Sequence, residues 1–260
     1  MPVDHAAWAA YLLAGVDERR PLQAITKQLD QLGIDDAYAI QAALLELQLG
    51  RGDTLAGAKL GLTSVAKQQQ MGVAEPVYGW VTGSSVLGAG GAVPLSELIH
   101  PRCEPEIVFV LADDLAGPGI TPGDVLDATE KIVGGIEIID SRFEAFSFTL
   151  PDVIADNTSA ARVAIGSDGV GPRDVDLTTI SCEFEVDGEI TGRATGAALL
   201  GDPALCVAML ANHLGKHGQK LEAGWIVMAG ATTDARPLGA DAVATARYSH
   251  LGSVTVTGKA

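Results

Sequence analysis

The first fifty residues carry apolar positions at the spacing of a helix. Residues 6–14 form a short segment that is mostly apolar. Further apolar residues recur at helical spacing: Leu22, Ile25, Leu29 and Leu32. Asp35 or Asp36 can cap a third helix, which ends at Gly50. We therefore expect residues 1–51 to form an N-terminal helical segment packed on the core of the protein.

From Gly52 onward the pattern changes to short strand-like runs separated by Gly and Pro. Two of these runs, residues 179–186 and 189–196, are joined by Asp187 and Gly188, a strong hairpin signal. Runs of this kind, mixed with helices, indicate an α+β fold. We expect residues 52–260 to form one compact domain.

Two helices in this second part carry start signals. Thr121 is a plausible N-cap with Asp124 three residues later, in the pattern of a capping box. Asp202 can cap a second helix, in which Pro203 takes the first position and which extends to about His217.

Three glutamates are the most informative polar residues. Glu104 and Glu106 stand two apart at the head of the apolar run 107–111, so on an extended strand both carboxylates project from one face. Glu137 lies inside the apolar run 132–139, where an unpaired charge is costly to desolvate. Three oxygen donors without His or Cys favour a hard divalent ion, Mg²⁺ or Mn²⁺, over zinc.

Structural interpretations of these residues stay open. A Glu-x-Glu pair on a strand is often a solvated outer face, and Glu137 can form an ion pair with Arg142 or Arg102. Lys59, a lone cation among small and apolar residues, either points into a cavity or lies in solvent. Three aromatic residues either wall a pocket or fill the core: Phe143, Phe146 and Phe148.

Two further stretches supply candidate ligand-binding groups. Asp156 to Ser159 are four consecutive polar residues after an apolar pair. Such a run is most often a turn or a helix cap, and less often a set of donors for a ligand carboxylate. Gly230 to Thr233 follow a predicted buried strand, and their backbone amides and hydroxyls can hold an anion.

Composition narrows the class of protein. The net charge is −16, with 17 Lys and Arg, which argues against nucleic acid or an anionic membrane as a partner. Every apolar stretch is shorter than the ~20 residues that span a bilayer. No secretory signal is visible at the start, and three widely spaced cysteines fit reduced thiols. We expect a cytoplasmic protein.

Seven motifs occur in one order along nearly the whole chain. They begin with Lys-Leu-Gly-Leu-Thr-Ser at 59–64 and Glu-Pro-Val-Tyr-Gly at 75–79. The others are Leu-Ser-Glu-Leu-Ile-His-Pro (95–101), Glu-Pro-Glu-Ile-Val-Phe (104–109), Glu-Ile-Ile-Asp-Ser-Arg (137–142), Leu-Pro-Asp-Val-Ile-Ala-Asp-Asn (150–157) and Gly-Asp-Pro-Ala (201–204). With these motifs the chain resembles the 2-keto-4-pentenoate hydratase and 4-oxalocrotonate decarboxylase family, within the fumarylacetoacetate hydrolase superfamily.

The resemblance implies a mixed β-sheet roll with N-terminal and flanking helices, in which residues 52–260 form the catalytic domain. It also implies that Lys59 is catalytic and that Mg²⁺ or Mn²⁺ binds at three matching carboxylates: Glu104, Glu106 and Glu137. The expected substrate-binding residues are Leu60, Ser159, Thr232 and Thr233. Members of the family form homo-oligomers, and its decarboxylases associate with the hydratase of the same pathway, so we expect both kinds of partner.

Val77 favours the decarboxylases, because the similar hydratases tend to carry an acid at this position. The chain departs from the family at Ala231, where a second glycine is common, and at Ala160, often a serine. We expect metal-dependent decarboxylation of 4-oxalocrotonate (2-oxo-3-hexenedioate), a small 2-oxo dicarboxylic acid, to 2-hydroxypenta-2,4-dienoate and CO₂ in meta-cleavage degradation of aromatics. The alternatives are a 2-oxopent-4-enoate hydratase and a non-catalytic partner of that hydratase.

Overall fold

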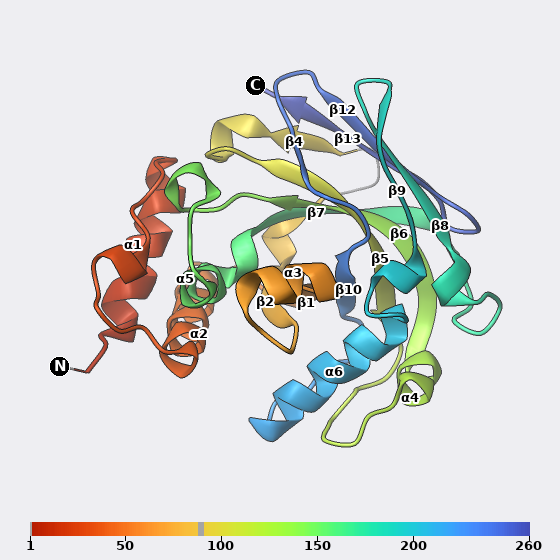
Figure 1. The fold of residues 1–260 in the computed structure, drawn as a ribbon, viewed down its shortest axis with the longest axis horizontal. Helices are drawn as coiled ribbons and strands as arrows, with labels where there is room; N and C mark the ends of the chain where they lie inside the picture. The colour runs from red at the N-terminus through yellow and green to blue at the C-terminus, as the bar shows by residue number, and fades with distance from the viewer. Residues whose placement is uncertain (1, 88–90) are drawn as a thin grey trace.

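The computed structural model describes residues 2–87 and 91–260, which form an α+β fold built on two sheets (Figure 1). The larger sheet is mixed, because β1 pairs with β10 and β3 with β7 in parallel while its other pairs are antiparallel. In spatial order its strands are β2 (Val77–Thr82), β1 (Leu55–Gly61), β10 (Ile226–Ala231), β5 (Arg102–Leu111), β6 (Thr129–Ile139), β7 (Ala160–Val170) and β3 (Val86–Leu87), with β11 (Arg236–Pro237) on β5.

The smaller sheet packs across the larger one and closes the main core. Its strands, in spatial order, are β4 (Ala92–Pro94), β13 (Gly252–Lys259), β12 (Val243–Tyr248), β8 (Ser181–Val186) and β9 (Glu189–Thr195). Strands β12 and β13 contact β6, and β13 also contacts β7. The core between the sheets buries Phe109, Ile136 and Phe184 completely.

Helices flank the sheets, as Figure 1 shows. Their bounds are α1 (His5–Glu18), α2 (Ile34–Gly50), α3 (Val65–Met71), α4 (Pro122–Asp127), α5 (Leu150–Ala155) and α6 (Pro203–Lys216). Single 3₁₀ turns connect many of the elements: η1 (Ile25–Lys27), η2 (Gly83–Ser85), η3 (Leu95–Glu97), η4 (Glu144–Phe146), η5 (Asn157–Ser159), η6 (Leu177–Thr179) and η7 (Gly196–Ala198). None of the helices in the described ranges is long and apolar enough to cross a membrane.

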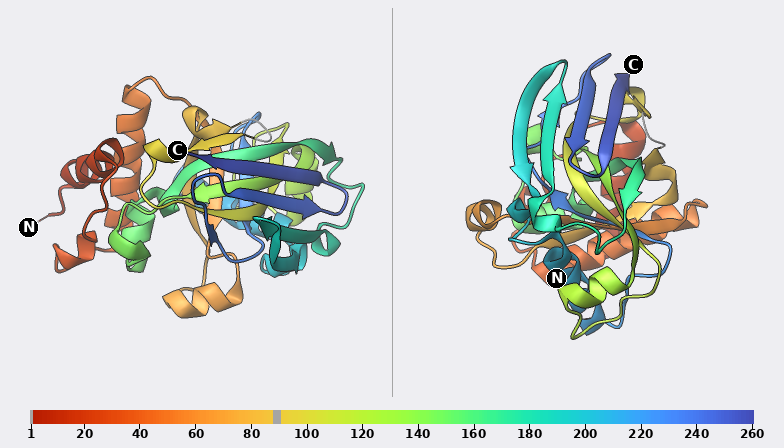
Figure 2. Two further views of the ribbon diagram at one scale, coloured as in Figure 1. Left: turned by 90° about the horizontal axis from the view of Figure 1, so that it is seen from above. Right: turned by 90° about the vertical axis from the view of Figure 1, so that its right-hand side faces the viewer.

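Helices α1 and α2 lie side by side at one end of the molecule (Figures 1 and 2). Their buried face forms a second apolar cluster, in which Leu12 and Ile40 join Val77 of β2, Phe143 and Ile154 of α5. The N-terminal helices therefore support one wall of the main sheet, the wall that carries Val77.

Local signals predicted several elements correctly. The Asp202 side chain accepts a hydrogen bond from Ala204 N (2.8 Å) at the start of α6, and Thr121 and Asp124 form the capping box of α4. Asp187 and Gly188 take positive φ angles, 52° and 82°, at the turn between β8 and β9.

The helix predicted from the spacing of Leu22 to Leu32 is wrong. This stretch contains only the short η1 turn. Leu22 instead forms a bridge with Phe143, and its backbone N–H donates to Arg142 O (2.7 Å). Contacts with a distant segment, rather than helical hydrogen bonds, therefore hold Leu22 in the core.

Candidate metal centre and active site

Three buried glutamates converge on the main sheet. Glu104 and Glu106 lie on β5, and Glu137 stands directly opposite Glu104 on the antiparallel neighbour β6. Each of the three contributes a carboxylate oxygen to a group whose atoms all lie within 4.8 Å of one another. The prediction that Glu104 and Glu106 share a face is therefore confirmed, and the register of β5 and β6 adds Glu137 to the same face.

Small residues and one tyrosine set the spacing of β5 and β6 at this point. Glu106 faces Gly135, where a Cβ would stand only 2.7 Å from Val108 Cγ2. A Cβ on the adjacent Gly134 would lie 2.5 Å from the ring of Tyr248 on β12. The Tyr248 hydroxyl lies within hydrogen-bond distance of the carbonyls of Glu106 (3.0 Å) and Gly135 (2.7 Å). The smaller sheet thus fixes the two strands that present the glutamates.

The charge of the three carboxylates is poorly compensated inside the protein. Glu106 Oε2 accepts from Gly230 N (2.8 Å), but Glu106 Oε1 and Glu137 Oε1 accept no hydrogen bond from any described residue. Burial, followed by the charges of its neighbours, raises the pKa of Glu106 well above its usual value. Burial likewise raises the pKa of Glu137 to about 7. A divalent cation among these oxygens would satisfy the unpartnered atoms and compensate the charge.

Lys59 of β1 adds one positive charge to this group. Its Nζ lies 3.1 Å from Glu137 Oε2, and its side chain is 3% exposed, so it points into the protein and not into solvent. Burial alone would lower the pKa of Lys59, but the charges of Glu137, Glu104 and Glu106 outweigh it and raise that pKa. In the metal-free site Lys59 is therefore held as an ammonium ion.

A cavity of about 360 Å³ opens beside Lys59 and Glu104. Val77, Phe146 and Phe148 line it, whereas Phe143 is fully buried in the cluster shared with the N-terminal helices. The cavity is large enough for a small organic acid. Its walls combine apolar side chains with a few charged groups, an arrangement typical of a site that positions such an acid.

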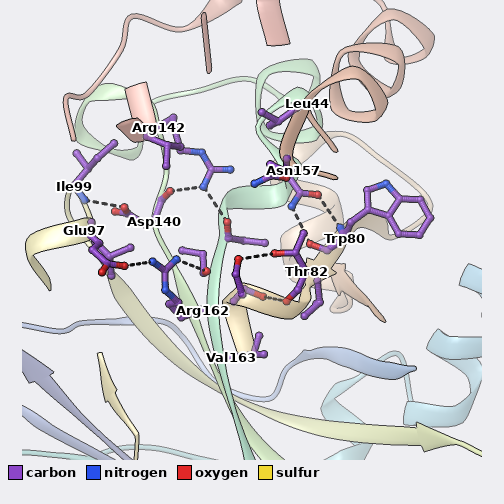
Figure 3. Close-up of a pocket in the computed structure, with 18 residues that line it drawn as sticks. Leu44, Trp80, Thr82, Glu97, Ile99, Asp140, Arg142, Asn157, Arg162 and Val163 are labelled. Carbon is purple, nitrogen blue, oxygen red and sulfur yellow. Dashed lines mark hydrogen bonds and ion pairs between the residues drawn. The ribbon is translucent and has the colours of Figure 1, made fainter. Parts of the chain in front are cut away.

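Ser159, the predicted ligand-binding hydroxyl, lines this cavity at the end of η5. Three consecutive residues of η5 adopt positive φ angles of 50°, 50° and 60°: Asn157, Thr158 and Ser159. A run of left-handed residues is costly and persists only where surrounding contacts impose it. At the start of this run, the Asn157 amide pairs with the backbone N–H and carbonyl of Trp80 on the edge strand β2 (2.7 and 2.9 Å), as Figure 3 shows.

A buried ion pair anchors the same turn. Arg142 pairs with Asp156. It also donates to the carbonyls of Asp140 (2.9 Å) and Ala160 (3.0 Å), as Figure 3 shows. Burial raises the pKa of Asp156 to about 6, although the positive charge of Arg142 opposes that shift. Because Arg142 is engaged here, it is not the partner of Glu137, which rules out one of the structural alternatives.

Comparison with known proteins places these features in a family. No family model matches the chain. It is 40% identical over 234 residues to a 4-oxalocrotonate decarboxylase of Pseudomonas putida, covering 90% of this chain and 89% of the relative. It is 41% identical over 202 residues to a 2-hydroxypent-2,4-dienoate hydratase of Pseudomonas putida, covering 77% of this chain and 91% of the relative. The chain belongs to the 4-oxalocrotonate decarboxylase and 2-keto-4-pentenoate hydratase family.

Solved structures show the same fold. The 4-oxalocrotonate decarboxylase from Pseudomonas putida G7, complexed with magnesium and adipate, matches with a TM-score of 0.95 at 37% identity, over 98% of this chain and 97% of that one. The structure of the same enzyme with calcium and acetate matches with a TM-score of 0.93 at 36% identity, over 98% of this chain and 96% of that one. A fumarylacetoacetate hydrolase from Exiguobacterium antarcticum matches with a TM-score of 0.63 at 15% identity, over 79% of this chain and 75% of that one. At this identity the match shows a shared fold alone. The predicted fold class is therefore confirmed.

Within this family member, the other predicted substrate-binding residues lie in three different environments. The Leu60 side chain packs in the main core, not among the side chains that line the cavity beside Lys59, so any contact with a substrate there would come from its backbone. Thr232 donates from both its N–H (2.9 Å) and its hydroxyl (3.1 Å) to Pro105 O. The Thr233 hydroxyl oxygen is buried and finds no hydrogen-bond partner within the described ranges.

Sequence reasoning missed two cations that line the cavity, Arg102 of β5 and Lys67 of α3. Arg102 stands two residues before Glu104, so the period of a strand that grouped Glu104 with Glu106 also places Arg102 on their face. Lys67 carried no comparable signal, because its position depends on how the short helix α3 is placed over the cavity.

Asn157 lines a second, smaller cavity of about 80 Å³ (Figure 3). Its charged side chains already have partners within the protein. Arg162 pairs with Glu97 (2.6 Å), and Asp140 accepts from the backbone of Ile99 (2.8 Å) and His100 (2.7 Å). This cavity is therefore part of the structural support of the turn that carries Ser159.

Proposed function

We propose that this chain is a divalent-metal-dependent 4-oxalocrotonate decarboxylase. The observation that carries the proposal is the convergence of three buried carboxylates beside a cavity lined by Val77. Some of their oxygens have no hydrogen-bond partner among the described residues. Two relatives named for this activity support it: one is 40% identical over 90% of this chain, and the other is 41% identical over 89% of it. One solved relative is complexed with magnesium and another crystal of it with calcium.

Glu104, Glu106 and Glu137 are the residues that would hold the ion. Carboxylate oxygens without nitrogen or sulfur ligands suit Mg²⁺ or Mn²⁺. When bound, the ion supplies Lewis acidity toward the carboxylate and ketone oxygens of a 2-oxo acid. Gly230 N, donating to Glu106 Oε2 (2.8 Å), orients one carboxylate for this purpose.

The reaction breaks the bond between the distal carboxylate and the carbon chain. The electron pair of that bond passes through the conjugated double bond to the 2-oxo oxygen, which takes up a proton, and CO₂ leaves. We assign Lys59 to this oxygen, because its ammonium group is the buried cation nearest the carboxylates. A fixed positive charge in a site shielded from water stabilises the negative charge that develops there.

Val77 supports decarboxylation over hydration. It is buried, it lines the cavity, and it offers no group that could deliver or accept the protons of a water addition.

We assign Ser159 and Thr233 to the binding of the substrate. Ser159 lines the cavity. Thr233 precedes the cavity-lining Asp234, and its buried Oγ1 has no partner among the described residues.

We also propose a homo-oligomer that associates with the hydratase acting on its product, as the family resemblance implies. Three buried, free cysteines fit a reducing compartment such as the cytoplasm: Cys103, Cys182 and Cys206.

Hydration of 2-hydroxypenta-2,4-dienoate is the second candidate, because a hydratase is as similar in sequence, at 41% identity, as the decarboxylases are. The test offers the Mg²⁺-loaded chain each substrate separately and follows CO₂ and products by chromatography. We expect CO₂ and 2-hydroxypenta-2,4-dienoate from 4-oxalocrotonate and no hydration of the dienoate. Formation of 4-hydroxy-2-oxopentanoate without CO₂ release would establish the hydratase instead.

A further inference from the structure

Three cationic side chains line the cavity beside the three glutamates, and only one of them forms an ion pair with an acidic side chain of the described residues. Lys59 is paired with Glu137. Arg102 and Lys67 line the same cavity, and neither forms an ion pair with an acidic side chain of the described residues. An active site that holds two uncompensated positive charges in a chain of net charge −16 points to an anionic group of the ligand.

Arg102 is placed at a distance from the glutamates that a ligand chain can span. Along β5, the exposed fraction rises from fully buried Glu106 through Glu104 to the partly exposed Arg102, all on one face. At a rise of roughly 3.4 Å per strand residue, the Arg102 backbone lies about 7 Å from that of Glu104. The charges along this strand therefore change from negative, deep in the site, to positive near its mouth.

Phe146 holds the Arg102 side chain in place. The guanidinium carbon of Arg102 lies 4.2 Å from the centre of the Phe146 ring, and the His100 ring centre lies 4.8 Å from that of Phe146. Stacking on a ring face fixes a guanidinium without using its N–H donors. Since no described residue accepts a hydrogen bond from the Arg102 guanidinium, those donors can form a bidentate pair with a carboxylate, in which the hydrogen bonds are roughly twice as strong as neutral ones.

Lys67 approaches the same region from a different element. It lies on α3, the short helix that stands away from the sheets in the left view of Figure 2, and its side chain is partly buried. On this helix Val65 is 59% exposed and Gln68 is buried, so one face of α3 is open to solvent, and the partly exposed Lys67 lines the cavity. Asp234 also lines the cavity and is exposed, and it is the competing acceptor for both cations.

We propose that Arg102, assisted by Lys67, binds the distal carboxylate of the substrate, while the 2-oxo-acid end lies at the three glutamates. This inference rests on the proposed function, and it makes these two cations the residues that select a dicarboxylic over a monocarboxylic 2-oxo acid. It also accounts for product release. The product has lost the distal carboxylate as CO₂, and with it the contact with Arg102.

The test compares two ligands that differ only at the distal end, 2-oxoadipate and 2-oxohexanoate. Calorimetry with the Mg²⁺-loaded full chain gives the ratio of their dissociation constants. We expect the wild type to prefer 2-oxoadipate, Arg102→Gln to lower that preference roughly 10- to 100-fold, and Arg102→Lys and Lys67→Gln to lower it less. Lys27→Gln, outside the cavity, removes the same charge and serves as the control.

Two results would overturn the inference. One is a wild type that binds both ligands equally. The other is an Arg102→Gln chain that loses affinity for both ligands to the same extent, since Arg102 would then support the shared 2-oxo-acid end or the cavity wall. Failure of the proposed function has a different outcome: the wild type keeps its preference for 2-oxoadipate but releases no CO₂ from 4-oxalocrotonate. Lys67→Gln, on an exposed helix, keeps the test valid if Arg102→Gln does not fold.

Discussion

At the scale of single residues, Glu106 combines complete burial with a deficit of partners. One of its oxygens accepts from Gly230, and the other accepts no hydrogen bond from the described residues. Its burial, followed by the charges of Glu137 and Glu104, raises its pKa well above the usual value. Such a residue costs the metal-free fold stability and is explained by the cation that it would bind.

The substitution Glu106→Gln separates the contribution of Glu106 to metal binding from its cost to the stability of the metal-free fold. We expect metal affinity to fall at least ~100-fold, beyond what loss of an outer-shell partner costs, and metal-dependent turnover to be lost. Because a neutral amide relieves repulsion with Glu104 and Glu137, the metal-free variant should unfold at the same temperature as the wild type or higher. Calorimetric metal titration and thermal unfolding measure both quantities.

Glu130→Gln is the matched control, since Glu130 lies on β6, the strand of Glu137, but is exposed. This substitution should change neither the metal affinity nor the unfolding temperature of the metal-free chain. A Glu106→Gln chain that binds metal as tightly as the wild type would remove Glu106 from the site.

At the scale of elements, the turn η5 depends on its contact with strand β2. A Cβ on Gly79 of β2 would stand 2.4 Å from Thr158 Oγ1 and 2.7 Å from Asn157 O. The strand can approach the turn this closely only because residue 79 has no side chain. The position of Ser159 in the cavity wall follows from that contact.

Gly79→Ala should therefore displace η5. We expect a loss of about 1–3 kcal/mol in the free energy of unfolding, the usual cost of overpacking, and weaker binding of 2-oxo acids. Urea denaturation measures the first and calorimetry the second. Gly50→Ala, at the end of α2, is the control: apart from the backbone of its own helix and its chain neighbours, no atom of the described residues lies within 4 Å of the new Cβ. It should be neutral or slightly stabilising. Equal effects of the two substitutions would contradict the role of this contact.

Elements with local signals were predictable from the sequence, and elements set by distant contacts were not. Asp202 capped its helix as expected because a cap needs only the next few residues. Leu22 did not enter a helix, because its backbone bonds to Arg142. In the site, strand periodicity was sufficient for Glu104 and Glu106. The position of Glu137 opposite Glu104 required the register of two strands, which depends on Gly134, Gly135 and the Tyr248 ring.

At the scale of the whole molecule, metal binding should couple to pH. Burial raises the pKa of Glu137 to about 7, above the ~4.3 of an unfolded chain. Between these values the metal-free folded chain binds more protons than the unfolded chain, so its stability falls as pH rises. A metal ion must displace those protons, and its apparent affinity should increase up to about pH 7.

The rise in unfolding temperature caused by saturating Mg²⁺ should accordingly be larger at pH 8 than at pH 6. Differential scanning calorimetry with and without EDTA measures it. Glu130→Gln should keep this pH dependence, since its carboxylate is exposed. A metal-induced rise that is constant, or greater at pH 6, would show that the buried carboxylates do not compete for protons and metal.

The most direct test of the central claim is CO₂ release from 4-oxalocrotonate as metal is added back to the chelated chain. The three converging carboxylates predict that CO₂ release rises with bound Mg²⁺ and saturates at about one ion per chain, with an equal amount of 2-hydroxypenta-2,4-dienoate formed. Full CO₂ release from the metal-free chain, or saturation with Mg²⁺ and no CO₂, would contradict the assignment.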